Sequence, residues 1–281
     1  MSMKNSVSAL MCYYNGEKPE NLNLALESLV NQTQQPEEVI LVRDGPVKDE
    51  LSEVVASYSE RFNNFKHILI ENNSGHGKAR ERGLAECSFE LVAICDSDDI
   101  CHPERIETQR AIFFKDPKVS VVSSNLAEFK NSIDNIVSIK SLPENDADLK
   151  RLIKWKCPIN QPSVMFRLHD VNSVGGYVHW YNNEDYYLWI RMAAKGFKFH
   201  NTPKPLVYFR TDENVFERRG GWKYFVSELK IQKLMLSAGL SNFGVFTVSV
   251  VVRFIVQVVL TNRLRMRFYE VFLREKGEIS K

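Results

Sequence analysis

The chain has 281 residues, 44% of them hydrophobic and 26% charged, which suits one large α/β domain or two small ones. A disordered chain would carry fewer apolar residues and a larger net charge than the +2 found here. The charge is uneven, because residues 201–281 hold 14 Lys and Arg against 7 Asp and Glu. This basic end predicts an anionic partner, either a nucleic acid or a membrane surface.

The five cysteines argue against a disulfide framework and against a cysteine zinc site, because their number is odd and no two have CxxC spacing. Free cysteines are typical of a reducing cytoplasm. The chain begins Met-Ser-Met-Lys-Asn and lacks the apolar run of a signal peptide. We therefore expect a cytoplasmic protein.

Short apolar runs alternate with amphipathic stretches through the first hundred residues, which predicts strands alternating with helices. The expected strands are residues 7–13, 38–43, 67–70 and 89–95, and the expected helices are residues 21–34, 48–62 and 78–86. This order predicts a parallel sheet covered on both faces, with its ligands at the carboxyl ends of the strands.

The rest of the chain continues with mixed elements and no clear linker before residue 240. Helices are expected at residues 103–115, 146–156, 184–195 and 217–240, and extended chain at residues 119–140, 163–167 and 197–210. Residues 243–274 have an apolar first half and a basic second half.

A cluster of carboxylates follows the apolar strand of residues 89–95. Asp96, Asp98 and Asp99 lie within four residues, and such close like charges cost stability unless a cation joins them. Mg²⁺ and Mn²⁺ prefer oxygen ligands and also bind phosphate oxygens. The cluster indicates a metal site at Asp98 and Asp96, with a solvated turn as the alternative.

Polar residues also follow two other expected strands. Asp44 precedes a glycine, as a contact to a base or a ribose would, or as an ordinary turn residue would. Asn73, Gly75, Lys78 and Arg80 surround a helix start, which suits an anion or a polar base edge. The spacing there matches neither a P-loop nor a dinucleotide fingerprint.

Two further sites carry charge late in the chain. Glu184 and Asp185 open a helix, either as capping carboxylates or with one of them poised as a general base. Arg218 and Arg219 precede two glycines and follow Arg210, an arrangement that suits a diphosphate clamp or a solvated basic turn.

In combination, these motifs resemble family 2 glycosyltransferases, which have the GT-A fold. The matching segments, in chain order, are residues 7–33, 39–46 (VILVRDGP), 72–99 (NNSGHGKARERGL through FELVAICDSDD) and 182–196 (NNEDYYLWIRMAAKG). The final part, with YFR, ERRGGWKY and TNRLRMRFYEVFLR, resembles the branch that builds O-antigen and exopolysaccharide repeat units. Enzymes of that branch add galactose or glucose, β1,3-linked, to an N-acetylhexosamine on undecaprenyl diphosphate.

The resemblance implies an α/β fold with a mostly parallel central sheet, flanking helices and C-terminal amphipathic helices. Residues 1–215 would form the catalytic domain, in which residues 1–100 bind the nucleotide and residues 101–215 bind the acceptor. Residues 216–281 would form a helical extension that associates with the membrane.

The resemblance also implies a role for each motif. Tyr14 would line the nucleotide pocket, and Asp44 with residues 73–80 would face the uracil of a UDP-sugar. Many relatives have two acidic residues where this chain has Arg43 and Asp44, so the first of the two acidic residues, which usually contacts the base, is replaced by an arginine here. Arg210, Arg218 and Arg219 are further candidate residues for binding the donor.

The implied reaction is an inverting transfer. Asp96 would lie near the ribose, and Asp98 would hold Mn²⁺ or Mg²⁺, which stabilises the diphosphate leaving group. Asp185, with Glu184 beside it, would take the proton from the attacking hydroxyl of an undecaprenyl-diphosphate-linked sugar.

The apolar stretch of residues 243–260 is interrupted by Arg253 and Gln257, which with Ser249 and Thr261 recur every four residues. An arginine at a bilayer centre costs about 2.5–3.5 kcal/mol on insertion scales, so a spanning helix is disfavoured. We expect a helix lying on the cytoplasmic face of the inner membrane, with burial against the catalytic domain as the alternative. The basic residues alternate with aliphatic runs instead of stacking aromatics, which argues against nucleic acid.

Two other functions are weighed against the transferase. A sugar-nucleotide pyrophosphorylase would need a glycine-rich signature with Arg and Lys after the first strand, where this chain has Cys12-Tyr13-Tyr14. A noncatalytic sugar-nucleotide-binding protein would have a broken acidic cluster or no base, whereas this chain has an intact acidic cluster and a candidate base.

Overall fold

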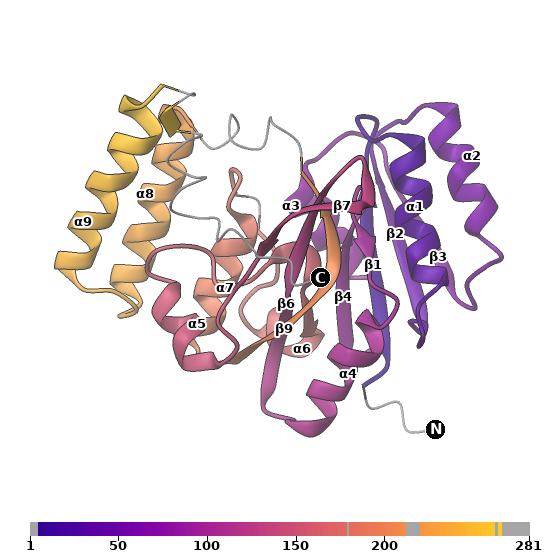
Figure 1. Ribbon diagram of the computed structural model, residues 1–281, viewed down its shortest axis with the longest axis horizontal. Helices are drawn as coiled ribbons and strands as arrows, with labels where there is room; N and C mark the ends of the chain where they lie inside the picture. Colours follow the sequence, from indigo (N-terminus) through magenta and orange to yellow (C-terminus); the bar gives the residue numbers. More distant parts are fainter. Residues whose placement is uncertain (1–4, 179, 212–219, 262–263, 266–281) are drawn as a thin grey trace.

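The protein is represented by a computed structural model that describes residues 5–178, 180–211, 220–261 and 264–265. Its centre is a nine-stranded sheet in the order β3-β2-β1-β4-β8-β6-β9-β5, with β7 paired to β6. Helices flank this sheet (Figure 1). The expected α/β class is confirmed.

Most elements follow one another as the sequence predicts, with shifts at their ends, whereas the short elements at residues 100–101, 161–163 and 168–173 are not predicted. The strands are β1 (Val7–Tyr13), β2 (Glu38–Asp44), β3 (Phe65–Ile70), β4 (Leu91–Asp96), β5 (Ile100–Cys101), β6 (Val119–Lys130), β7 (Ser132–Lys140), β8 (Met165–Arg167) and β9 (Lys198–Arg210). The α-helices are α1 (Pro19–Val30), α2 (Asp49–Tyr58), α3 (His76–Leu84), α4 (Arg105–Lys115), α5 (Asp146–Leu152), α6 (Leu168–Ser173), α7 (Glu184–Ala194), α8 (Trp222–Ser237) and α9 (Phe243–Phe254). A 3₁₀ turn, η1, covers Gln161–Ser163, and a π-helical turn, η4, covers Ile255–Val259.

The first half of the sheet is parallel. β1 lies between β2 and β4, and β3 pairs with β2 on the outside. Neighbouring side chains of β1 point to opposite faces, so Leu10 joins the core shared with α3 and α7, while Ala9 and Met11 join the core shared with α1 and α2. The carboxyl ends of these strands therefore meet at one edge, where the sequence places its polar motifs.

The second half of the sheet is mixed, which departs from the mostly parallel sheet expected from the sequence. β8 runs antiparallel to both β4 and β6, whereas β9 runs parallel to β6. β5 pairs antiparallel with the end of β9, with Ile100 opposite Tyr208. This pairing brings Arg210, the last residue of β9, beside the acidic loop that precedes β5.

Some helix ends differ from the sequence-based prediction. α1 begins at Pro19, two residues earlier than expected, because proline is tolerated in the first turn of a helix. The expected helix beyond residue 243 is regular only as far as Phe254, after which η4 widens the turn. Residues 266–281 lie outside the described residues.

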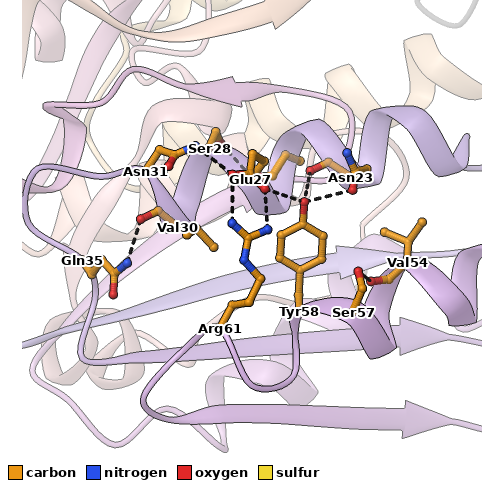
Figure 2. A network of polar contacts seen from close by, with 11 residues as sticks. Asn23, Glu27, Ser28, Val30, Asn31, Gln35, Val54, Ser57, Tyr58 and Arg61 are labelled. Atoms are coloured by element: carbon orange, nitrogen blue, oxygen red, sulfur yellow. Dashed lines mark hydrogen bonds and ion pairs between the residues drawn. The ribbon is translucent and has the colours of Figure 1, made fainter.

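α1 and the segment after α2 are joined by a polar network, which Figure 2 shows. The guanidinium of Arg61 donates to both carboxylate oxygens of Glu27, at 2.5 and 3.0 Å, and the Tyr58 hydroxyl donates to Glu27 Oε2 at 2.9 Å. The bond from Arg61, then that from Tyr58, lowers the pKa of Glu27 to about 2. The network fixes the two helices to one another on one face of the sheet.

α8 and α9 lie side by side at one end of the molecule, opposite α2 (Figure 1). α8 also packs on α7, where Asn183 Nδ2 donates to Ser227 Oγ at 3.2 Å and Ser227 Oγ donates to the Tyr181 carbonyl at 2.7 Å. The helix pair is thus bonded to the residue that precedes α7. None of the described helices is both long and apolar enough to cross a bilayer.

Candidate active site

A cavity of about 240 Å³ lies at the carboxyl ends of β1 and β2. It is lined by Cys12, Tyr13, Tyr14, Asp44, Asn73, Gly75, His76 and Ala79. Four of the predicted nucleotide contacts, Tyr14, Asp44, Asn73 and Gly75, therefore meet here. The His76 ring lies edge-on to Tyr14, with the ring centroids 6.3 Å apart. Aromatic walls beside a polar loop suit a flat heterocycle.

Asp44 shapes this cavity by holding the loop that follows β3. Its Oδ1 accepts hydrogen bonds from the Ser74 amide at 2.7 Å and the Ser74 hydroxyl at 2.8 Å, and its Oδ2 accepts one from the Gly75 amide at 2.9 Å. Gly45 has φ of +88°, and an added Cβ there would lie 2.8 Å from the Asn73 amide nitrogen. Only glycine fits this close approach, so the turn after β2 can pack directly against the loop after β3.

The two cations of α3 that are predicted to bind the nucleotide, Lys78 and Arg80, lie in different surroundings. Lys78 is exposed and does not line the cavity. Arg80 is buried, and its guanidinium bonds Asp96 Oδ1 at 3.0 Å and Glu184 Oε1 at 3.3 Å. Burial alone would lower the pKa of Arg80, but the nearby acidic groups, Asp96 foremost, outweigh it and raise that pKa. Arg80 is therefore a permanent cation that joins the end of β4 to the start of α7.

The acidic loop after β4 holds an additional carboxylate from the first βα connection. Ser97 Oγ donates to Glu17 Oε2 at 2.6 Å, which places Glu17 beside the loop. Asp98 reaches solvent, yet desolvation within the loop, followed by the charges of Asp96 and Glu17, raises its pKa to about 7. The loop thus holds an excess of negative charge that a cation would stabilise.

Arg210, at the end of β9, is hydrogen-bonded to Asp98 and Asp99 of the acidic loop. Asp99 Oδ1 accepts a hydrogen bond from the Arg210 amide at 2.8 Å, and Arg210 Nε donates to the Asp98 carbonyl at 3.0 Å. Asp99 Oδ2 is buried and has no hydrogen-bond partner in the described part of the chain. Burial, then the charges of Asp98 and Asp96, raises the pKa of Asp99 well above its usual range. The predicted diphosphate contacts Arg218 and Arg219 lie outside the described residues.

Asp185 lies in the first turn of α7. Its Oδ1 accepts a hydrogen bond from the Tyr186 amide at 2.7 Å. Burial, followed by the charge of Glu184, raises the pKa of Asp185 to about 6. A carboxylate with such a pKa is ionised at neutral pH and is more basic than a free aspartate, which suits proton abstraction. Because Arg80 bonds Glu184, this turn is fixed against the end of β4.

The sequence of this chain matches a known family along most of the region just described. Residues 8–175 match the profile of Glycosyl transferase family 2. The chain belongs to glycosyl transferase family 2. The family resemblance inferred from the motifs is therefore confirmed, and the protein is a glycosyltransferase.

Two bacterial relatives match this glycosyltransferase over most of its length. It is 35% identical over 255 residues to the UDP-Gal:alpha-D-GlcNAc-diphosphoundecaprenol beta-1,3-galactosyltransferase of Escherichia coli, covering 91% of this chain and 92% of that protein. It is 37% identical over 239 residues to the amylovoran biosynthesis glycosyltransferase AmsE of Erwinia amylovora, covering 84% of this chain and 88% of that protein.

Comparison with a solved structure identifies the fold. The structure of Staphylococcus aureus TarS residues 1–349 with UDP-GlcNAc matches this glycosyltransferase with a TM-score of 0.69 at 19% identity, covering 95% of this chain and 76% of that one. The expected GT-A fold is confirmed.

Glycosyltransferases of the GT-A class typically use a divalent metal. The described residues contain no group of three or more His, Cys, Asp or Glu that could hold a metal ion by themselves. Mg²⁺, however, is usually bound by one or two carboxylates, with substrate phosphates and water completing its shell. Asp98 reaches solvent beside the charges of Asp96 and Glu17, and Asp99 Oδ2 is buried without a partner among the described residues, so the loop offers carboxylate oxygens that fit this shared mode of binding.

The sequence did not predict the place of Glu17 or the bridging role of Arg80. Glu17 lies in a polar turn that looks solvated in the sequence, and nothing local predicts its contact with Ser97, 80 positions away. His76 belongs to residues 73–80, which are predicted to face the uracil, and it lines the cavity.

Proposed function

We propose that this glycosyltransferase transfers a hexose, galactose or glucose, from a UDP-sugar to GlcNAc or GalNAc carried on a diphosphate-linked undecaprenyl lipid. The product would be a β1,3 linkage, formed with inversion, in an O-antigen or exopolysaccharide repeat unit. The 35% identity to a galactosyltransferase of this specificity, over 92% of that protein, supports the choice of substrates.

The observation that carries the catalytic part of the proposal is the buried Arg80 bridge. Asp96 ends the strand beneath the acidic loop, and Glu184 adjoins Asp185 at the start of α7. The bridge supports the assignment of residues 1–100 to donor binding and of residues 101–215 to acceptor binding and proton removal. It also supports a single site that both parts of the chain share.

The donor would lie along the edge of the sheet. Tyr14, Asn73 and Gly75 would surround the uracil, in a pocket whose floor is fixed by Asp44. Asp96 would contact the ribose. Lys78, Arg210, Arg218 and Arg219 are proposed cationic contacts for the diphosphate, of which Arg210 is already bonded to the acidic loop.

Asp98, with Asp96, would hold Mn²⁺ or Mg²⁺, which when bound neutralises the charge that develops on the leaving diphosphate. The Asp185 carboxylate would accept the proton of the acceptor hydroxyl as its oxygen attacks the anomeric carbon from the face opposite the diphosphate. Glu184, held by Arg80, would keep the turn that carries Asp185 in place.

We place this reaction at the cytoplasmic face of the inner membrane, where a lipid-linked acceptor would be presented. Residues 216–281 would form the peripheral membrane-associating extension. No nucleic acid is part of the proposal.

The test is to incubate purified protein with Mn²⁺, a panel of UDP-sugars and synthetic GlcNAc- or GalNAc-diphosphate-lipids. The expected result is one added hexose by mass spectrometry, with a β1,3 linkage by NMR. Release of UDP without a new linkage, or exchange of pyrophosphate into the sugar nucleotide, would contradict the proposal and would favour a hydrolytic or a pyrophosphorylase activity instead.

A further inference from the structure

α9 is amphipathic in the reverse of the usual sense, because its polar side faces the protein. Ser249 is 1% exposed and Gln257, in the following turn η4, is 4% exposed. Arg253 lies between them in the same stripe and is partly buried. A helix on the surface of a protein in water normally points its apolar side inward. The polar stripe predicted from the sequence is therefore an internal contact.

Several hydrogen bonds hold the polar side of α9 inward. Arg253 Nε bonds Glu228 Oε2 of α8 at 2.7 Å, and Arg253 Nη2 donates to the Trp155 carbonyl at 2.8 Å. The backbone carbonyl of Gln257 accepts a hydrogen bond from the Gly221 amide, just before α8, at 2.9 Å, whereas Gln257 Oε1 and Ser249 Oγ are buried with no hydrogen-bond partner among the described residues. Rotating α9 to hide its apolar side would leave Glu228 buried and unpaired, which is costly.

The opposite side of α9 and η4 is a stripe of exposed aliphatic side chains, which we call the outer stripe. Its members are Val248, Val251, Val252, Ile255 and Val259, each between 44% and 61% exposed. Their spacing of three and four residues places them on one side of the helix. Contiguous apolar surface of this kind marks a site of interaction with a protein or a membrane.

Aromatic side chains extend the outer stripe toward the start of α8. Phe254 is 40% exposed and packs edge-on to Phe225, with centroids 5.5 Å apart, and Phe225 contacts Trp222 at the same centroid distance. Trp222 is itself 62% exposed. Exposed tryptophan beside an aliphatic surface is typical of residues at a membrane–water interface.

We propose that the outer stripe, with Trp222, docks on the surface of an anionic lipid bilayer. Charge complementarity favours lipid, because residues 254–281 hold six Lys and Arg against three Asp and Glu. The α8–α9 hairpin, which is the pair of helices that lie side by side, is bonded through Ser227 of α8 to Asn183. Asn183 directly precedes the turn carrying Glu184 and Asp185. Docking through this side would therefore hold the base close to a lipid-linked acceptor. The choice of lipid as occupant rests in part on the proposed function.

The test compares three proteins in sedimentation with vesicles of phosphatidylglycerol and phosphatidylethanolamine. They are the unmodified chain, the double variant Val251→Glu/Ile255→Glu in the outer stripe, and the control Phe114→Glu/Leu24→Glu. Phe114 on α4 and Leu24 on α1 are apolar and 77% and 44% exposed, so the control adds the same two charges at other exposed apolar sites. We expect the unmodified and control proteins to bind, and the double variant to partition at least about tenfold less.

Transfer assays separate the docking from the chemistry. With a GlcNAc-diphosphate acceptor on a short, water-soluble alkyl chain, all three proteins should react at the same rate. With the long-chain acceptor in vesicles, the double variant alone should be slow. Absence of transfer from every protein would contradict the proposed function, while vesicle binding would still decide the docking.

The docking proposal is overturned if the unmodified protein does not bind these vesicles, or if the double variant binds them equally well. It is also overturned if the outer stripe joins two copies of the chain, seen as a dimer that the double variant dissociates without any binding to vesicles. Because the glutamates could affect folding, thermal unfolding is measured in parallel. If they do, the milder pair Val251→Ser/Ile255→Ser decides the outcome, with the same ordering expected.

Discussion

Individual carboxylates in this site are made more basic by their surroundings. Desolvation is the first cause at both Asp98 and Asp185, and neighbouring carboxylates are the second. Each also has an arginine nearby that moderates the rise, Arg210 for Asp98 and Arg80 for Asp185. In the proposed function, the same physical cause prepares Asp98 for a metal ion and Asp185 for a proton.

Asp98→Ala should weaken metal-dependent binding of the UDP-sugar, by at least about tenfold, because a charge-assisted contact to the cation is lost. Isothermal titration calorimetry with and without Mn²⁺ measures the difference. Asp49→Ala, an exposed aspartate on α2, is the control. An Asp98→Ala protein that keeps its full metal-dependent affinity would remove Asp98 from the metal site.

The pH dependence of turnover should report Asp185. Its pKa of about 6 means that lowering the pH through 6 protonates the carboxylate, which can then no longer accept a proton. We expect kcat, measured with saturating donor and Mn²⁺, to be highest above pH 6 and to fall about tenfold per unit well below it. A kcat that is flat between pH 5 and pH 8 would argue against a titrating base.

At the residue scale, runs of like charge could be found from sequence, and long-range partners could not. Asp98 and Asp185 stand in local patterns that also occur in solvated turns and helix caps, and it is their order along the chain that suggests a site. The partners of Arg80 are 16 and 104 positions away, so no window of sequence contains the bridge. The same applies to Glu17, whose carboxylate becomes part of the site only when β1 and β4 pair.

At the element scale, the α8–α9 hairpin depends on an ion pair within its own interface. Glu228 and Arg253 have side chains only 6% and 13% exposed, and they bond at 2.7 Å. Burial alone would lower the pKa of Arg253, but Glu228 outweighs it and raises that pKa. The spacing of polar residues predicted a stripe on this helix, but the side that the stripe would face depends on Glu228 and Trp155, which lie 25 and 98 positions away.

Arg253→Met should lower the free energy of unfolding by about 3–5 kcal/mol, because it leaves Glu228 buried without a cation. Urea unfolding followed by circular dichroism measures this change. The double variant Arg253→Met/Glu228→Gln should recover part of the loss, since no uncompensated charge remains. Equal stability of Arg253→Met and the unmodified protein would show that the pair does not hold the hairpin.

At the scale of the whole molecule, the parallel half of the sheet follows from the sequence and the mixed half does not. Alternation of apolar runs and amphipathic helices predicts β1 to β4, because each crossover helix returns the chain in the same direction. β8 is only three residues long, and it pairs with both β4 and β6 across large separations. Its position is set by the space between those strands, which no local pattern encodes.

In the function proposed here, two distant parts of the chain form one catalytic site, in which the first holds the donor and the second removes the proton from the acceptor hydroxyl. Asp185→Asn tests this most directly, since it preserves the size of the side chain and removes its basicity. We expect kcat to fall by about 10²–10⁴-fold while the calorimetric Kd for the UDP-sugar with Mn²⁺ stays unchanged. Unimpaired turnover by Asp185→Asn would remove Asp185 from the role of base.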